Sequence, residues 1–577
     1  MNSARSLRKF AVVCLLMVLP MLAPMLAVGQ IDNYAPVTDE RLTNPEPENW
    51  LMYRRTYDSW GYSPLDKINA SNVKQLFPVW SISTGVVEGH QAPPIVNNGV
   101  MFVATPQNQV LALDAKTGDL LWRYVRELPE DLVQIHPTNR GVGLHGDNVY
   151  LATVDCFLVA LNAKTGEVVW EKKVEDYTGG YYMTLAPLVA KGKVQVGVSG
   201  GEFGIRGFVA AYDAKTGDEV WKTYTIPGPG EPGHDTWSGD KWKTGGASVW
   251  ITGSYDPELN QAYWGTGNGA QWMGDSRPDD NLYANSVLAL DADTGAIKGY
   301  HQYHHNESWD WDEVSAPLLL DVPKNGSTIK ALVHPGRNGY LWTLERKADG
   351  IKFVDAKPYV KQDVFSSIDP ETGRPSYNEI KKPGMGKMAE FCPSLWGGKD
   401  WPPAAYSPKT GFLYSPANEN LCGALTGQDN PPYVRGQLWL GVEIKDIVMT
   451  VREDADHIGE LQAWDMKTGK KAWTQNFKYH NWGPVLATAG DLIFMGSTND
   501  RYFRAFDAKT GSKLWEYRTN SGITAVLVTY EVDGVQYVSV QSGWGVDAQR
   551  MQNRVDKAYG FKTDVPQGGV IWTFAVK

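Results

Sequence analysis

The chain has 577 residues, of which 21% are charged, and it contains 59 glycines, 23 tryptophans and 28 tyrosines. This composition fits glycine turns and aromatic packing in an all-β repeat protein, and it excludes a long helical or disordered chain. The formal net charge of −10 argues against nucleic acid as a partner and is compatible with docking of a basic protein.

The first 29 residues have the features of a secretory signal peptide. Three basic residues precede an apolar run over residues 10–27, and Ala27-Val28-Gly29 fits a cleavage site. Two prolines interrupt the run, which favours a signal peptide over a retained membrane helix. We therefore expect export to the periplasm, no membrane anchor, and a mature chain of residues 30–577 whose formal charge is −13 once those three positive charges are lost.

One phrase, Ala-x-Asp-x-x-Thr-Gly-x-x-x-Trp, recurs along the mature chain. Its copies begin at Ala112, Ala160, Ala211, Ala289, Ala463 and Ala505, and all end in tryptophan except the fourth, which has Gly299. Degenerate forms occur as DPETG at Asp369 and SPKTG at Ser407. Such self-similarity is typical of a repeat architecture.

Each copy is interpreted as a β-hairpin. In the first copy, Asp114 and Thr117 can bond nearby backbone groups, and Gly118 supplies the positive φ that the turn requires. Trp122 then begins the return strand and offers a large apolar surface to a neighbouring sheet. Because a lone hairpin cannot bury that surface, the units must stack.

The spacing of the copies predicts the fold. Successive steps of 48, 51 and 42 residues leave room for a four-stranded sheet in each unit. Four-stranded sheets arranged radially form a β-propeller, and roughly eight blades fit the mature chain. We predict an all-β, eight-bladed β-propeller with tryptophan-docking motifs, as one domain over residues 30–577. A β-solenoid is the alternative, although its repeats are shorter and lack this tryptophan.

Three segments outside the repeats gather oxygen ligands. The segment SGGEFGIRG places Glu202 among glycines, YWGTGNGAQW contains Asn268, and HHNESWDWDEV sets Asp310 and Asp312 on the same side of an extended chain. Carboxylate and amide oxygens suit a hard cation. Taken alone, each segment is more often a surface turn or a solvated loop.

Three cysteines remain in the mature chain. In an oxidising compartment we expect one disulfide, between Cys392 and Cys422, and a buried free thiol at Cys156. The sequence Cys-x-x-Cys-His does not occur in the chain, so a c-type haem has no attachment site.

The content and order of these motifs, over essentially the whole mature chain, resemble the methanol/ethanol dehydrogenase family of pyrroloquinoline quinone (PQQ) enzymes, which are eight-bladed propellers. The resemblance implies a periplasmic enzyme that oxidises an alcohol to an aldehyde or ketone, with hydride transfer to metal-bound PQQ. A soluble c-type cytochrome or another external acceptor would take the electrons, and the protein would be a monomer or a homodimer. A PQQ-dependent sugar or polyol dehydrogenase and a non-enzymatic propeller scaffold are the alternatives.

The resemblance also implies roles for individual residues. The metal ligands would be Glu202, Asn268 and Asp310, with Asp310 also the catalytic base and Arg337 the arginine beside the reactive quinone carbonyls. The PQQ-binding residues would be Trp250, which stacks on one face, and Arg140, Thr184, Ser199, Gly200, Gly201, Glu202, Arg337, Asp400 and Trp482. Trp272 would lie in the substrate pocket.

The chemistry gives these roles a reason. PQQ carries three carboxylates, which suit Arg140 and several hydroxyl or backbone donors. A metal ion on the quinone acts as a Lewis acid, Asp310 takes the alcohol proton, and Arg337 stabilises negative charge on the quinone oxygen.

Three features depart from the family. The two adjacent cysteines that many relatives have before the Asn-Arg-Gly motif are absent, so Ile135 or His136 would cover the second face of PQQ. Gln91 stands where relatives often have a glutamate, and it would still bond the cofactor. Asp312 matches the lanthanide-dependent branch, so we expect a light lanthanide as an alternative to Ca²⁺. The alternative is that Asp312 faces away from the metal site, or only forms hydrogen bonds to groups around the metal ligands.

Overall fold

The computed structural model describes residue 31 and residues 34–324, 326–496 and 499–577. The predicted signal peptide lies outside the described residues. Strands account for 42% of the chain and helices for 9%, so the all-β prediction is confirmed. The two α-helices of the described residues are α1 (Asp39–Thr43) and α2 (Gly545–Tyr559), and neither is long and apolar enough to cross a membrane.

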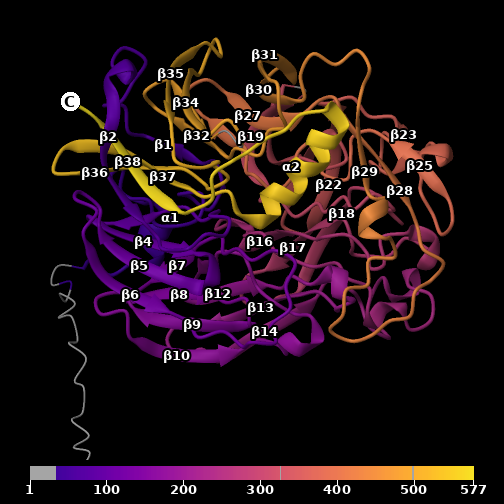
Figure 1. The fold of residues 1–577 in the computed structure, drawn as a ribbon. Coiled ribbons are helices and arrows are strands. Elements are labelled where there is room, and N and C mark those ends of the chain that lie inside the picture. Colours follow the sequence, from indigo (N-terminus) through magenta and orange to yellow (C-terminus); the bar gives the residue numbers. More distant parts are fainter. Residues whose placement is uncertain (1–30, 32–33, 325, 497–498) are drawn as a thin grey trace, which may run out of the picture.

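Eight sheets of four or five strands occur in the described part of the chain (Figure 1). Five of them use consecutive strands: β3 (Ile95–Asn97), β4 (Val100–Thr105), β5 (Gln109–Asp114) and β6 (Leu120–Val125); β7 (Val142–His145), β8 (Asn148–Ala152), β9 (Phe157–Asn162) and β10 (Val168–Lys173); β11 (Leu188–Ala190), β12 (Lys193–Gly197), β13 (Phe208–Asp213) and β14 (Glu219–Tyr224); β15 (Ser254–Asp256), β16 (Gln261–Gly265), β17 (Ser286–Asp291) and β18 (Ile297–Gln302); and β19 (Leu318–Lys324), β20 (Ser327–Pro335), β21 (Tyr340–Lys347) and β22 (Gly350–Pro358).

The other three large sheets combine more distant strands. They are β26 (Ala405–Ser407), β27 (Phe412–Asn418), β30 (Gly459–Asp465) and β31 (Lys470–Phe477); β1 (Tyr62–Ser63), β32 (Val485–Thr488), β33 (Leu492–Gly496), β34 (Tyr502–Asp507) and β35 (Lys513–Arg518); and β2 (Leu76–Ser83), β38 (Val570–Val576), β37 (Val535–Ser542) and β36 (Val528–Val532). Two smaller sheets pair β23 (Phe365–Ile368) with β24 (Pro375–Tyr377), and β28 (Leu421–Thr426) with β25 (Met388–Phe391) and β29 (Val448–Val451). Because β2 pairs with β38, strands from both ends of the chain share one sheet.

The repeated phrase forms the hairpin turn that the sequence predicts. Asp114 Oδ1 accepts the backbone N–H groups of Lys116 at 2.8 Å and Thr117 at 2.9 Å, and Gly118 has a φ of 80°. Strands β5 and β6 are antiparallel across this turn. The turn is therefore fixed by the local hydrogen bonds of the Asp114 carboxylate and by the positive φ of Gly118.

The tryptophan of one repeat contacts the turn of the next. Trp122, Trp170, Trp221 and Trp473 donate their Nε1–H groups to the carbonyls of Ala163, Ala214, Ala292 and Ala508 at 2.9–3.4 Å. The rings also lie against the turn glycines, since a Cβ on Gly166 would lie 2.7 Å from the Trp122 ring. Each tryptophan thus couples the last strand of one sheet to the neighbouring sheet.

The fourth repeat lacks this tryptophan for a steric reason. A Cβ on Gly299 would lie 2.5 Å from the Cα of Gly350, at the start of β22. Strand β18 therefore approaches β22 backbone to backbone, and a large side chain at Gly299 has no room.

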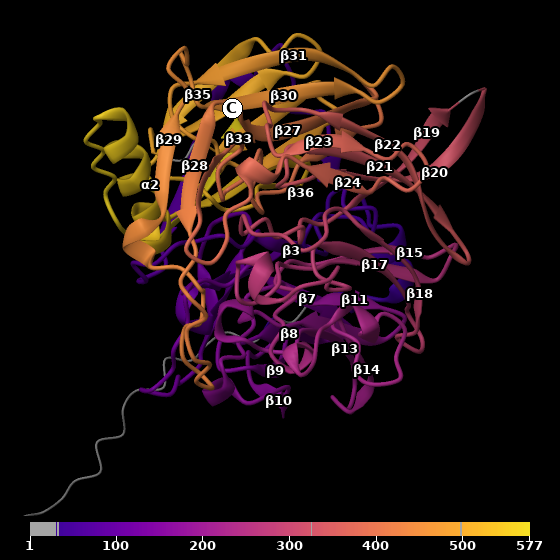
Figure 2. The ribbon, with the colours of Figure 1, turned by 90° about the vertical axis from the view of Figure 1, so that its right-hand side faces the viewer.

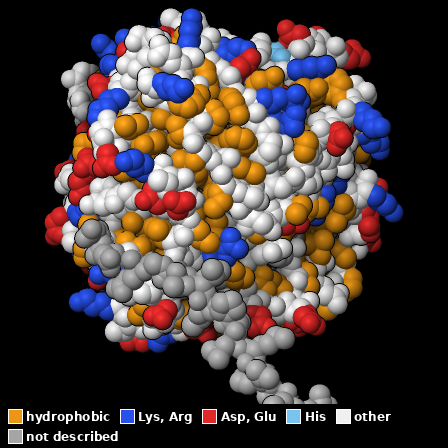
Figure 3. Space-filling view, turned by 60° about the vertical axis from the view of Figure 1, so that its left-hand side comes forward, with side chains coloured by type: hydrophobic (Ala, Val, Ile, Leu, Met, Phe, Trp, Pro, Cys, Tyr) orange, Lys and Arg blue, Asp and Glu red, His pale blue; other side chains and the backbone are white. Residues whose placement is uncertain are grey.

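Helix α2 is an insertion between β37 and β38. It packs beside β29, on one side of the molecule in Figure 2. On the face shown in Figure 3, acidic and basic side chains are interspersed toward the edge and hydrophobic side chains gather nearer the middle.

Candidate active site

Most of the predicted site residues line one cavity of about 350 Å³. They are Arg140, Thr184, Ser199, Gly200, Glu202, Trp250, Trp272, Asp310, Asp312, Arg337, Asp400 and Trp482. Ile135 and His136, which we expected to cover the second face of PQQ, also line it. Residues as far apart in the sequence as Ile135 and Trp482 therefore converge on one site.

Three predicted residues lie behind the wall of the cavity or away from it. Asn268 is buried and donates its Nδ2–H to Asp310 Oδ1 at 3.0 Å. Gly201 begins the short 3₁₀ turn η4 (Gly201–Phe203), and a Cβ there would lie 3.7 Å from Asn268 Oδ1. Gln91 is buried, its backbone carbonyl accepts from Val526, and it is not among the residues that line the cavity. A cofactor contact of Gln91 stays a prediction.

Two buried aspartates lie at the polar end of the cavity. Asp310 and Asp312 are 8% and 6% exposed. Burial raises the pKa of Asp310 well above its usual range, the nearby carboxylates of Asp312 and Glu202 raise it further, and Arg337 opposes them. Burial and the Glu202 charge likewise raise the pKa of Asp312 to about 7, against the lowering effect of Arg337. Carboxylates that penalise one another's ionisation are stabilised by a bound cation.

The donor set around these aspartates fits a hard cation. It comprises three carboxylates and the Asn268 amide oxygen, which are the oxygen ligands that Ca²⁺ and similar ions prefer. No group of three or more His, Cys, Asp or Glu side chains among the described residues is already closed around one point. Glu202, Asp310 and Asp312 nevertheless line the same cavity, and Asn268 contacts Asp310.

The side chain of Asp312 faces the site. Its Oδ2 accepts the indole N–H of Trp250 at 2.6 Å, and its Oδ1 accepts the backbone N–H of Asn268 at 2.5 Å. Both carboxylates contact Asn268, but Asp310 has a φ of 64°, so the segment is not the extended chain on which the sequence-based prediction depended.

Arg337 connects three acidic residues. It donates to the backbone carbonyl of Asp310 at 2.8 Å and to Asp400 Oδ1 at 2.9 Å, and Nη1 lies 4.0 Å from Asp312 Oδ2. Despite burial, the Asp400, Asp310 and Asp312 charges raise the pKa of Arg337 above its usual value. The guanidinium is therefore a fixed positive charge beside the aspartates.

Arg140 supplies a second buried cation on the other side of Trp250. Its guanidinium lies 4.8 Å from the Trp250 ring and 5.0 Å from the Trp401 ring, and it donates to Thr184 Oγ1 at 2.5 Å. Thr184 Oγ1 is 3.2 Å from Ser199 Oγ. Burial lowers the pKa of Arg140 to about 10, and its Nε has no protein partner in the described residues. A cation with an unused donor beside two hydroxyls fits the carboxylates of PQQ.

Several residues that line the cavity were not predicted from the sequence. From α2 and the segment before β29 come Met551, Leu438, Leu440, Ile444 and Ile447, which give the cavity an apolar wall. Asp547 of α2 accepts from His136 Nδ1 at 2.8 Å. These residues carry no repeat or ligand pattern, so only the fold reveals them.

A further missed residue is Glu313, next to Asp312. Its Oε2 accepts the backbone N–H of Arg337 at 3.0 Å and lies 2.7 Å from His334 Nε2. The backbone N–H of Asn338 bonds Oε1 at 3.2 Å. Because Glu313 directly follows Asp312, its position next to the Asp-x-Asp pair could have indicated that it supports the site.

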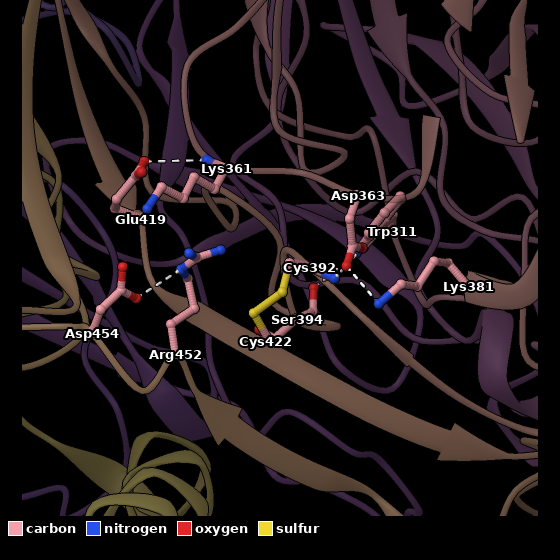
Figure 4. The surroundings of a disulfide bond; sticks show 10 residues. All are labelled: Trp311, Lys361, Asp363, Lys381, Cys392, Ser394, Glu419, Cys422, Arg452 and Asp454. Atoms are coloured by element: carbon pink, nitrogen blue, oxygen red, sulfur yellow. Dashed lines mark hydrogen bonds and ion pairs between the residues drawn. A yellow bond between two sulfur atoms is a disulfide. The ribbon is translucent and has the colours of Figure 1, made fainter. Parts of the chain in front are cut away.

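The predicted disulfide between Cys392 and Cys422 is confirmed (Figure 4). Nearby, Trp311 donates its indole N–H to the carbonyl of Ser394 at 2.8 Å. The loop that the disulfide closes therefore contacts the residue between Asp310 and Asp312. Cys156 is a buried free thiol, also as predicted.

Comparisons with known proteins agree with this site. The family model "PQQ: Glucose/ethanol/alcohol dehydrogenase, beta-propeller domain" matches residues 50–364 and 474–538. The chain is 39% identical to the quinoprotein alcohol dehydrogenase PedH of Pseudomonas putida, over 96% of this chain and 95% of that protein. It is 35% identical to the lanthanide-dependent methanol dehydrogenase of Methylacidiphilum fumariolicum, over 91% and 89%.

A solved structure of a europium-containing methanol dehydrogenase superimposes with a TM-score of 0.86 at 34% identity, and covers 93% of this chain and 99% of that one. The quinohemoprotein alcohol dehydrogenase of Comamonas testosteroni gives a TM-score of 0.83 at 33% identity, over 94% and 82%. The chain therefore belongs to the family of PQQ-dependent alcohol dehydrogenases with a β-propeller domain.

Proposed function

We propose that this protein oxidises an alcohol to an aldehyde or ketone, with PQQ and one metal ion as cofactors. The observation that carries the proposal is the single cavity whose lining unites Glu202, Asp310 and Asp312 with Arg337 and Arg140. A propeller that only scaffolds other proteins has no need to bury Asp310 and Asp312, or to place a third carboxylate and two buried arginines around the same cavity.

The eight large sheets would be the blades of one ring. The tryptophan contacts between consecutive repeats and the pairing of β2 with β38 support this arrangement. Loops inside a sheet contribute Glu202, Asn268 and Arg337, and loops between sheets contribute further site residues such as Trp250 and Asp310. The sheets would supply the rigid scaffold for these loops.

Family membership and the donor set indicate which residues would hold the cofactors. Trp250 would stack on PQQ, and Arg140, Thr184 and Ser199 would bind its carboxylates. Further contacts would come from Asp400 and Trp482. Glu202, Asn268, Asp310 and Asp312 would hold the metal. Bound PQQ and the metal would supply an electron-pair acceptor and a Lewis acid.

The residues of the chain then supply proton transfer and electrostatic stabilisation. Asp310 would accept the hydroxyl proton of the alcohol on a carboxylate oxygen, and Asn268 fixes the other oxygen through its hydrogen bond to Oδ1. Arg337, held by Asp400, would stabilise developing negative charge. Trp272 and the apolar wall would exclude water from the reacting alcohol.

The apolar wall bears on the choice of substrate. Leu438, Leu440 and Met551 offer no hydrogen bonds to a polyhydroxylated molecule. A simple alcohol therefore fits the cavity better than a sugar or polyol.

Asp312 favours a lanthanide. With Glu202 and Asp310 it provides three negative charges, which balance La³⁺ or Ce³⁺ better than Ca²⁺. Metal-free protein given PQQ and either Ca²⁺ or La³⁺ should respond more strongly to La³⁺. The Asp312→Ala variant should lose that preference, and an intact La³⁺ response in this variant would contradict the lanthanide assignment.

The predicted signal peptide supports a periplasmic location, and the absence of a c-type haem motif from the sequence supports a separate electron acceptor. A soluble c-type cytochrome is the acceptor that we propose. Reduction of added cytochrome c, followed by its absorbance during alcohol oxidation, tests this step.

The function itself is tested with protein reconstituted with PQQ and La³⁺. Primary, secondary and cyclic alcohols, a sugar and a polyol are compared with an artificial electron acceptor. We expect turnover with alcohols, and failure with every alcohol despite bound PQQ would overturn the assignment.

A further inference from the structure

A buried ion pair behind the cavity supports the loop that carries Asp310. The pair consists of Arg277 and Glu307, whose side chains are 1% and 0% exposed, and neither residue lines the cavity. We propose that Glu307 and Arg277 are positioning residues that hold Asp310 and Trp272 in a fixed relation to each other. This inference rests on the proposed role of Asp310 in alcohol oxidation.

Glu307 shapes the backbone on both sides of Asp310. Its Oε2 accepts the backbone N–H of Trp309 at 2.8 Å and that of Trp311 at 3.4 Å. Between these two residues, Asp310 has a φ of 64°, a left-handed conformation that is uncommon for residues other than glycine. Such a conformation persists only where its surroundings fix it, and the Glu307 carboxylate provides that restraint.

The two tryptophans that flank Asp310 pack away from the cavity. Their rings are stacked, with centroids 5.0 Å apart, and Trp309 donates to the Lys381 carbonyl at 2.8 Å. Neither indole lines the cavity, whereas Asp310 and Asp312 both do. The indoles of Trp309 and Trp311 thus point away from the cavity while the carboxylates between and after them face it. This arrangement depends on the backbone conformation that Glu307 stabilises.

Arg277 ties this loop to the loop of Trp272. Its guanidinium donates to the carbonyls of Trp272 at 3.1 Å and Glu307 at 2.8 Å, and Nη2 lies 3.4 Å from Glu307 Oε1. It also donates to the Gln271 carbonyl at 2.9 Å and to Asn281 Oδ1 at 2.7 Å. One planar group with five donors thus joins the segment of the proposed base to the segment of the proposed substrate contact, and a lysine has no equivalent fork.

The location of this ion pair argues for a role in geometry. A buried ion pair contributes little net stability compared with well-packed apolar residues. A catalytic base, in contrast, loses much of its effect when it is displaced by about 1 Å. Groups that orient metal ligands also typically change metal affinity or activity by about 10–100-fold when they are removed.

The test compares Glu307→Ala, Glu307→Gln and Arg277→Lys with a control, Asp256→Asn. The control breaks a second buried ion pair, Arg346–Asp256, whose side chains are each 6% exposed and which joins β15 to β21. Neither residue of the control pair lines the cavity. Thermal unfolding, kcat and KM with PQQ and La³⁺, and Eu³⁺ affinity of the PQQ-free protein by luminescence are measured for each variant.

We expect Glu307→Ala to lower both kcat and Eu³⁺ affinity about 10–100-fold, with a much smaller change in KM. Glu307→Gln should recover part of the loss, because its amide oxygen can still accept the Trp309 N–H. Arg277→Lys should resemble Glu307→Gln. The control should reduce the unfolding temperature and leave kcat and Eu³⁺ affinity unchanged.

Wild-type kcat and Eu³⁺ affinity in folded Glu307→Ala, or equal losses in the control, would overturn the proposal. If Glu307→Ala does not fold, Glu307→Gln and Arg277→Lys measured against the control decide the question by the same criteria. A wild-type protein that oxidises no alcohol would refute the proposed function, whereas the Eu³⁺ affinities would still decide the positioning role.

Discussion

Aspartates serve opposite purposes in the repeat turns and in the 304–314 segment. In the turn after β13, Asp213 Oδ1 accepts the N–H groups of Lys215 and Thr216, each at 2.9 Å, and the Thr216 bond is the main cause of a lowered Asp213 pKa. Asp310 is instead buried beside Asp312 and Glu202, and its pKa is raised. The two regions use the same side chain in opposite electrostatic settings.

The difference lies in where the charge finds its partners. The Asp213 carboxylate accepts hydrogen bonds from two backbone N–H groups of its own turn, so it needs no ligand to balance its charge. Around the cavity, four carboxylates (Glu202, Asp310, Asp312 and Asp400) face the two arginines Arg337 and Arg140, and burial makes uncompensated charge costly. The charges of the turn aspartates are therefore balanced within the folded chain, whereas those of the site aspartates would be balanced by the cation that we propose.

Replacement of one aspartate in each region by asparagine should give the largest difference in kcat between two variants. Asp310→Asn should lower kcat by about 10²–10⁴-fold, because it removes the proposed general base. The matched variant Asp213→Asn should leave kcat unchanged and change the free energy of unfolding by less than about 0.5 kcal/mol, because an amide Oδ1 can accept the same two N–H groups, as Asn162 does in the second copy. Steady-state kinetics and urea unfolding measure the two quantities, and a kcat for Asp310→Asn within threefold of wild type would break the comparison.

The repeat tryptophans should matter for stability alone. Trp122→Ala is expected to lower the free energy of unfolding by about 3–5 kcal/mol, because the ring is 1% exposed and fills the contact to the next sheet. The folded fraction should retain wild-type kcat. Val125→Ala in the same strand, where the side chain is 61% exposed, is the control and should change little. A loss of kcat in folded Trp122→Ala would show that the two regions are not separable.

The disulfide lies between the two regions. Replacing Cys392 and Cys422 with serine opens a loop of 30 residues and should lower the free energy of unfolding by about 3 kcal/mol. Because Ser394 accepts from Trp311, kcat should also fall, by about threefold to tenfold. Denaturant unfolding and kinetics on the same preparation separate the effects, and an unchanged kcat would restrict the disulfide to a stabilising role.

The smallest expected effect concerns pH at the cavity wall. Burial opposes protonation of His136, but the Asp547 carboxylate outweighs it and raises the His136 pKa above 6.5. Although burial acts in the other direction, the His136 charge lowers the Asp547 pKa below 3.8. The stabilisation by His136 is therefore complete below pH 6.5 and is lost as pH rises through the raised pKa, and that of Asp547 is lost only as pH falls through its lowered pKa.

The unfolding temperature of the wild type should thus fall more between pH 6 and pH 9 than that of His136→Gln. His457, whose pKa is also raised, is present in both proteins and cancels in the comparison. An equal pH dependence of the unfolding temperature in the two proteins would show that the His136–Asp547 pair does not contribute to stability.

Much of the scaffold could be predicted because its determinants are local. The Asp-x-x-Thr-Gly turn bonds itself within five residues, so its recurrence at Asp114 and Asp213 reveals the hairpins. The metal-ligand candidates were also visible as a cluster of acidic residues, although the left-handed backbone of Asp310 that brings both aspartates to Asn268 could not be predicted from their spacing.

The support for the site could not be predicted, because it depends on partners far apart in sequence. Glu307 acts through Arg277, 30 positions away, and Asp547 of α2 meets His136 across 411 positions. The motif of Gln91 suggested a cofactor contact, but Gln91 is not among the residues that line the cavity, so that contact stays a prediction. Burial and backbone direction decide such contacts, and neither is a property of a short motif.

The most direct test of the account is a crystal structure of the protein with PQQ and La³⁺, with the metal located by its anomalous scattering. We expect one La³⁺ in the cavity, bound by oxygens of Glu202, Asn268, Asp310 and Asp312. La³⁺ bound elsewhere, or bound there without Asp310 as a ligand, would contradict it.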